Sequence, residues 1–309
     1  MEVRTLGNTG LKVSHLGAGL AAIGEELTKS DIAQAGRVLN VALDGGINFL
    51  DTAASYFISE ELVGSTVAHR RDEYILATKG GRVAGGRSFA WNYAGISESI
   101  NRSLRRLKTD HLDIMQLHSC GIDVLKEGSV IQALVDAKSS GKTRFIGYSG
   151  DNEEAQWAVE SGLFDTLQTS FSITDQHART KLFKQAKQKG MGIIIKRTIG
   201  NGAWRSDQSP TANLKFGPMR AYGDEYFRRA QIMCKDGPIM EEPEDRIVTS
   251  LGFVLAHTEV DIALVGTQNP DHMTANIDIV ENQLPIHDGV VKEIQRRFDE
   301  NGESWTQLL

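Results

Sequence analysis

The chain has 309 residues, of which 40% are hydrophobic and 24% are charged, and its formal net charge is −6. This composition is typical of a globular protein, and the acidic balance argues against a nucleic-acid-binding surface, which would be basic. No apolar run reaches the roughly 18 residues that span a bilayer, and the N-terminus lacks a signal-peptide pattern. With only two cysteines, Cys120 and Cys234, we expect a cytoplasmic protein that contacts neither membrane nor nucleic acid.

The chain opens with a predicted hairpin and then alternates strand-like and helix-like segments. Residues 1–9, followed closely by the turn-forming Gly10, indicate a small hairpin at one end of the domain. Amphipathic helical patterns separate the strand-like segments that follow, and several of these patterns end at a glycine. The predicted strands are the β-branched runs at residues 13–16, 48–51, 75–79, 113–118, 145–149, 166–170, 192–197 and 263–267.

Eight strands with helices between them predict a (β/α)8 TIM barrel, and we expect one domain over residues 1–309. An open doubly wound sheet would show Gly-x-Gly-x-x-Gly after its first strand, with a helix directly behind it. Residues 16–20 contain two glycines, but no helical pattern follows them at once. Residues 199–245, interrupted by Gly and Pro, predict a long functional loop after the seventh strand.

Polar residues stand at the ends of three successive predicted strands. Asp51, Lys79 and His118 end these strands, and Tyr56 follows shortly after Asp51. Because a TIM barrel gathers its catalytic residues at the carboxyl ends of its strands, we expect these four side chains to meet. Each alone has an ordinary explanation, such as a helix cap, a surface lysine or a core aromatic residue. The four together favour an active site.

These residue types can reduce a carbonyl. An ammonium beside a phenol lowers the pKa of the phenol, and a carboxylate beside the ammonium keeps it protonated. As a hydride reaches the carbonyl carbon, Tyr56 would protonate the developing alkoxide, and His118 would position the carbonyl. No metal is needed, and no spacing of metal ligands suggests one.

In these segments the chain resembles the aldo-keto reductase family over essentially its whole length. Residues 4–14 are similar to the start of many bacterial members, and residues 48–56, 76–79 and 117–118 match the segments of the family that carry its Asp, Tyr, Lys and His. The resemblance implies a TIM barrel that binds NADP(H) in extended form and reduces the carbonyl group of aldehydes, ketones or sugars. Such small-molecule substrates would be its partners. The implied catalytic residues are Tyr56, Asp51, Lys79 and His118.

The resemblance also implies a set of cofactor-binding residues. Asn152 would substitute for a family asparagine at the position of Gly150, and Lys196 occupies the position of an aromatic residue that stacks on the nicotinamide. His272 stands where an arginine usually binds the 2′-phosphate, and a histidine lacks the permanent bidentate fork of arginine. NADP(H) is the family default, and NAD(H) is possible. The implied residues are Ser149, Gln168, Lys196, Arg197, Gly266, Thr267, His272 and Asn276.

Two other functions compete with this interpretation. A regulatory or redox-sensing subunit would keep the fold and bind NADP(H) but turn over little. A barrel isomerase or aldolase would use Lys79 as a Schiff-base amine. We favour neither, because the four polar residues are intact and an acidic neighbour keeps the lysine charged.

Overall fold

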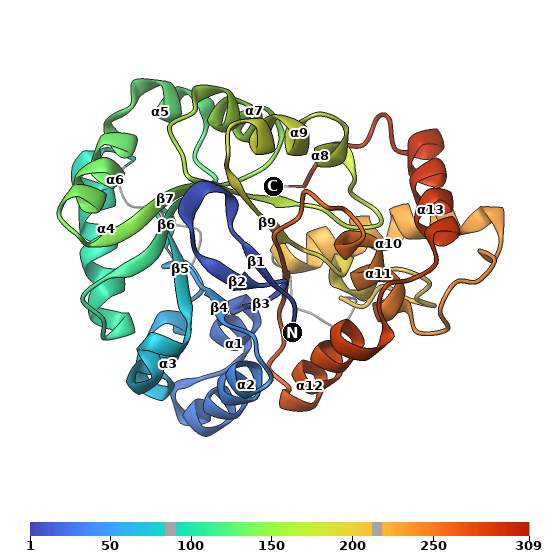
Figure 1. Cartoon of the computed structure of the whole chain (residues 1–309), viewed down its shortest axis with the longest axis horizontal. Helices are drawn as coiled ribbons and strands as arrows, with labels where there is room; N and C mark the ends of the chain where they lie inside the picture. The colour runs from blue at the N-terminus through green and yellow to red at the C-terminus, as the bar shows by residue number, and fades with distance from the viewer. Residues whose placement is uncertain (84–90, 212–217, 309) are drawn as a thin grey trace.

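The computed structural model describes residues 1–83, 91–211 and 218–308. In this part of the chain parallel strands close into a barrel and helices surround it (Figure 1). This is the predicted (β/α)8 barrel, so the prediction of the fold is confirmed. The strands, in order round the barrel from β3 to β10, which pairs back with β3, are β3 (Leu16–Gly19), β4 (Phe49–Asp51), β5 (Ile75–Gly80), β6 (Leu112–His118), β7 (Thr143–Ser149), β8 (Thr166–Ser170), β9 (Gly192–Lys196) and β10 (Ile262–Val265).

Helices connect the strands and cover the outside of the barrel (Figure 1). None in the described residues is long and apolar enough to cross a membrane. The α-helices are α1 (Ala21–Glu26), α2 (Ile32–Asp44), α3 (Ser59–Thr66), α4 (Tyr93–Leu107), α5 (Ile122–Glu127), α6 (Ser129–Ser139), α7 (Asn152–Ser161), α8 (His177–Thr180), α9 (Leu182–Gln188), α10 (Pro218–Met233), α11 (Arg246–Leu255), α12 (Pro270–Asp278) and α13 (Asp288–Asn301).

An N-terminal hairpin closes one end of the barrel (Figure 1). It pairs β1 (Val3–Thr5) with β2 (Lys12–Ser14), antiparallel. Its buried side chains, Leu6, Leu11 and Val13, form one hydrophobic cluster with residues from the starts of the barrel strands, such as Phe49 and Ile262. The amino-terminal end of the barrel is therefore filled with apolar side chains, which leaves the carboxyl ends of the strands for polar chemistry.

Two predicted boundaries at the N-terminus are wrong. The hairpin extends past residue 9 to Ser14, and the first barrel strand begins at Leu16 rather than at Val13. Val13 is apolar because it packs against the end of the barrel, and not because it belongs to the barrel wall. In β3 a Cβ atom on Gly17 would lie 2.8 Å from side-chain atoms of Ile262 and Leu264, so only glycine fits there. A glycine weakens the sequence pattern of a strand, which explains why the prediction placed this strand too early.

The structure has helices in two places where the sequence predicted a loop or no immediate helix. Residues 199–245 are not one loop, because α10 lies within them and buries Tyr226, Ala230 and Met233 at helical spacing. A helix also follows β3 at once, contrary to expectation, since α1 begins at Ala21. It has six residues, too few for a periodic pattern to stand out.

The apolar closure of the barrel predicts a difference between two residues of the hairpin. Leu6 is fully buried in the cluster, whereas Val3 is 56% exposed. Leu6→Ala is expected to lower the free energy of unfolding by about 2–5 kcal/mol, because it leaves a cavity that the barrel cannot refill. Val3→Ala, the matched control, should change it by less than about 0.5 kcal/mol. Urea unfolding measures both, and equal losses would contradict this role of the hairpin.

Candidate active site

Lys79 lies at the centre of a polar cluster at the carboxyl ends of β4 and β5. Its side chain has no solvent exposure. The Nζ atom donates to Asp51 Oδ2 at 2.6 Å, to the Thr52 carbonyl oxygen at 3.0 Å and to the Tyr56 hydroxyl at 3.3 Å. An ammonium has three N–H donors, so these three acceptors satisfy it completely.

The charge states in this cluster follow from burial and from the neighbouring charges. Burial alone would lower the pKa of Lys79, but the Asp51 carboxylate and the hydrogen bonds to Asp51 and Tyr56 raise it above its ordinary value. The amine is therefore an ammonium at neutral pH, which disfavours a Schiff-base nucleophile.

The hydroxyl of Tyr56 keeps its proton at neutral pH. Burial raises the pKa of Tyr56, and the nearby Lys79 cation offsets this only in part. The expectation that Lys79 lowers the pKa of Tyr56 overall is wrong, because burial destabilises the phenolate more than Lys79 stabilises it. Tyr56 is thus a protonated donor with a cation beside it.

His118 ends β6 and lies beside Tyr56. The two rings meet edge to face, with their centroids 5.8 Å apart, and the Ser55 hydroxyl lies 3.2 Å from His118 Nδ1. Burial lowers the pKa of His118 well below its ordinary value, and the Lys79 and Arg82 cations lower it further. A neutral imidazole therefore faces the phenol and can form one more hydrogen bond.

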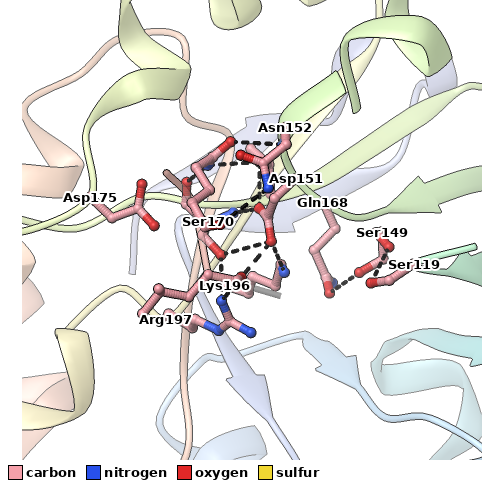
Figure 2. A network of polar contacts seen from close by, with 12 residues as sticks. Ser119, Ser149, Asp151, Asn152, Gln168, Ser170, Asp175, Lys196 and Arg197 are labelled. Carbon is pink, nitrogen blue, oxygen red and sulfur yellow. Dashed lines mark hydrogen bonds and ion pairs between the residues drawn. The ribbon is translucent and has the colours of Figure 1, made fainter. Parts of the chain in front are cut away.

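Amide side chains from across the barrel orient Asp51. Gln168 Nε2 donates to Asp51 Oδ1 at 2.9 Å, and Gln116 Nε2 does so at 3.4 Å. The Ser149 hydroxyl in turn donates to Gln168 Oε1 at 2.9 Å (Figure 2). Strand register produces this contact, because Ser149 on β7 pairs with Gln168 on β8.

A second ionic cluster lies nearby, at the ends of β7, β8 and β9 (Figure 2). Lys196 Nζ donates to Asp151 Oδ2 at 2.5 Å, and Arg197 lies 4.0 Å from the same oxygen. Burial alone would raise the pKa of Asp151, but the Lys196 and Arg197 cations outweigh burial and lower it. Burial lowers the pKa of Lys196 to about 8. The pair is therefore mostly ionised at neutral pH.

The C-terminal segment covers this second cluster. Arg197 donates to the Leu308 carbonyl oxygen at 2.5 Å, and Gln307 donates to the Ser170 carbonyl oxygen at 2.8 Å. Asn152 donates to Gln307 through both its backbone and its side-chain nitrogen. Asn152 thus binds the end of the chain, and the ammonium of Lys196 is paired with Asp151.

The remaining residues implied by the resemblance lie around the end of β10. Gly266 and Thr267 follow this strand directly, and His272 and Asn276 lie in α12. A cavity of about 690 Å³ opens here, and Asn276 does not line it. Its lining residues are Ala22, Glu26, Gln34, Asn201, Pro210, Gly266, Thr267, Gln268, Asn269 and His272.

A family model described as Aldo/keto reductase family matches residues 15–296. The chain belongs to this family. Among its relatives, the 6-dehydroglucose reductase of Novosphingobium aromaticivorans is 34% identical over 86% of each chain. The L-galactose dehydrogenase of Arabidopsis thaliana is 29% identical over 91% of this chain and 88% of its own. An aldo-keto reductase from Bacillus halodurans, solved in a holo form, superposes with a TM-score of 0.79 at 28% identity over 96% of each chain.

This aldo/keto reductase is thus an oxidoreductase of a family that uses nicotinamide cofactors and acts on small-molecule carbonyl compounds. In the described residues no three His, Cys, Asp or Glu side chains gather as metal ligands would.

Several residues of the aldo/keto reductase site escaped the sequence analysis. Gln116 precedes His118 by two positions on β6, and Asp151 follows Ser149 by two positions. A wider form of the signal that selected Asp51, a polar residue within two positions of a strand end, could have found both. The contacts of Gln307 and Leu308 with the site had no such signal, because they depend on how the far end of the chain returns to the barrel.

The buried charge of Lys79 predicts a large effect of removing its partner. Asp51→Asn is expected to lower the free energy of unfolding by about 3–5 kcal/mol, because an uncompensated ammonium stays buried. The double variant Asp51→Asn with Lys79→Met removes both charges and should recover much of that loss. Urea unfolding at neutral pH compares them, and equal losses in the single and double variants would contradict a buried ion pair.

Proposed function

We propose that this aldo/keto reductase catalyses NAD(P)H-dependent reduction of aldehyde, ketone or sugar carbonyls, and the reverse oxidation of alcohols. We also propose that residues 1–309 form one catalytic domain. The observation that supports this function best is the chain of contacts at the barrel mouth. The phenol of Tyr56 lies 3.3 Å from an ammonium, which lies 2.6 Å from a carboxylate.

The proposed roles follow from the charge states. The reduced nicotinamide, when bound, supplies a hydride to the carbonyl carbon. Tyr56 donates its proton to the oxygen as negative charge develops there, and Lys79 stabilises the phenolate that remains. Asp51 keeps Lys79 charged and aimed. Neutral His118 orients the carbonyl oxygen by a hydrogen bond before the proton moves.

The proposed cofactor site joins the two polar clusters to the cavity at β10. Gln168 and Ser149 would bind the nicotinamide amide, since Gln168 keeps one N–H donor after its bond to Asp51. Lys196 and Arg197 would lie beside the ring. Towards the other end of the cofactor, the proposed binding residues are Gly266, Thr267, His272 and Asn276. The cavity there has about 690 Å³, which suits part of a dinucleotide.

We propose that the substrates include sugars. Two relatives bear names that refer to sugar substrates, L-galactose and 6-dehydroglucose. Sugars bring several hydroxyl groups beside their carbonyl, which a polar barrel mouth can bind. A panel of aldoses, ketosugars and simple aldehydes, assayed with each cofactor, would rank these classes.

Replacement of the proposed acid gives the direct test of catalysis. Tyr56→Phe is expected to lower the rate of carbonyl reduction by at least about 100-fold, because general acid catalysis contributes about 10²–10⁴-fold. Cofactor binding, measured by fluorescence titration, should stay within about threefold of wild type. Tyr93→Phe, at a tyrosine that is 43% exposed on α4, is the matched control and should keep full activity. A Tyr56→Phe variant that retains most of its activity would contradict the mechanism. A wild-type protein that binds cofactor but turns over no carbonyl would favour a regulatory role.

A further inference from the structure

A carboxylate lines the cavity at the end of β10. Glu26, the last residue of α1, lines it, and its Oε2 accepts a hydrogen bond from the Gln268 side chain on the opposite loop. Gln34 of α2 donates to the Gln268 carbonyl oxygen at 2.9 Å. The loop after β10 is thus tied to two helices, and the tie brings the carboxylate of Glu26 to the cavity.

Among the described residues, Glu26 forms no ion pair with a lysine, arginine or histidine. Among the described lining residues it is the sole carboxylate, and none is a lysine or an arginine. No hydrogen bond to Glu26 Oε1 forms within the described part of the chain. An ionised carboxylate oxygen is an acceptor only, so this oxygen can bind a hydroxyl group and repels an anion.

Helix α12 begins at the same cavity and would by itself attract an anion. Asn269, which lines the cavity, caps this helix by accepting from the Asp271 backbone N–H at 2.9 Å. Asp271 lies in the first turn and is exposed, and its negative charge opposes the positive end of the helix dipole. The Thr267 hydroxyl already accepts from the Asn269 N–H at 3.0 Å. The backbone N–H groups of Asn269 and Asp271, which could otherwise bind a phosphate, therefore already donate hydrogen bonds within the loop.

The two nicotinamide dinucleotides differ at one position of the adenosine ribose. NADP(H) has a 2′-phosphate there, with a charge of about −1.5 to −2 at neutral pH, whereas NAD(H) has a hydroxyl. Proteins bind the phosphate best with arginine, whose fork forms two charge-assisted hydrogen bonds, and accept the hydroxyl with an aspartate or glutamate. The described lining of the cavity contains a glutamate and no arginine, so it suits the ribose hydroxyl of NAD(H).

We infer that Glu26 makes this site select NAD(H) over NADP(H), an assignment that rests on the proposed function. Glu26 accepts hydrogen bonds from the ribose hydroxyls of NAD(H) and repels the 2′-phosphate of NADP(H). His272, at the position where an arginine would bind that phosphate, lacks the fixed charge and the fork that could offset the repulsion.

Separate fluorescence titrations with NADH and NADPH test the assignment. The wild-type protein is expected to bind NADH at least about tenfold more tightly than NADPH. Glu26→Gln should tighten NADPH binding about five- to tenfold without tightening NADH binding, and His272→Arg should tighten NADPH binding further. Glu98→Gln is the matched control, because it removes the same charge from an exposed residue of α4 and should leave both dissociation constants unchanged.

The possible failures are distinguishable. Tighter binding of NADPH than of NADH by the wild-type protein would overturn the selection of NAD(H) and leave the proposed reductase intact. An unchanged NADH-to-NADPH ratio in Glu26→Gln would overturn the role of Glu26. Binding of neither dinucleotide would overturn the assignment and the proposed function together.

Discussion

A lysine with no solvent exposure can stay charged only where a countercharge and hydrogen-bond acceptors replace the water it has lost. Asp51, Thr52 and Tyr56 supply these acceptors to Lys79. Asp51 must in turn be oriented, and amides on β6 and β8 donate to its other oxygen. One buried ammonium thus connects four strands of the barrel, and the mouth of the barrel is organised around it.

The rest of the fold keeps this polar group apart from the apolar core. The hairpin fills the amino-terminal end of the barrel with leucine and valine, so the polar side chains gather at the opposite end. There the strand ends carry two ionic clusters, one around Lys79 and one around Asp151. The C-terminal segment covers the second cluster, which links the last residues of the chain to the site. Burial then decides the charge states, since it keeps Tyr56 protonated and His118 neutral.

The sequence predicted the repeated strands and helices of the barrel, and it missed features that depend on contacts between distant segments. Seven of the eight barrel strands were placed from short runs rich in apolar or β-branched residues, because strands buried on both faces are mostly apolar. The first strand failed, since close packing at Gly17 requires a residue that weakens the pattern. The direction of the pKa shift of Tyr56 was also wrong, because the sequence names the neighbouring lysine but not the depth of burial. The Lys196–Asp151 pair and the return of the C-terminus depend on contacts between distant segments.

The charge of Lys79 is the central claim, and NMR of protein labelled at the lysine ¹³Cε atoms measures it directly. The Asp51 carboxylate raises the pKa of Lys79, so its resonance should not shift from about pH 6 to about pH 10. Lys196, whose pKa burial lowers to about 8, should titrate in the same spectra and serves as an internal control. Single Lys→Met variants would assign the two signals. A Lys79 resonance that titrates at or below the Lys196 midpoint would contradict a permanently charged lysine beside Tyr56.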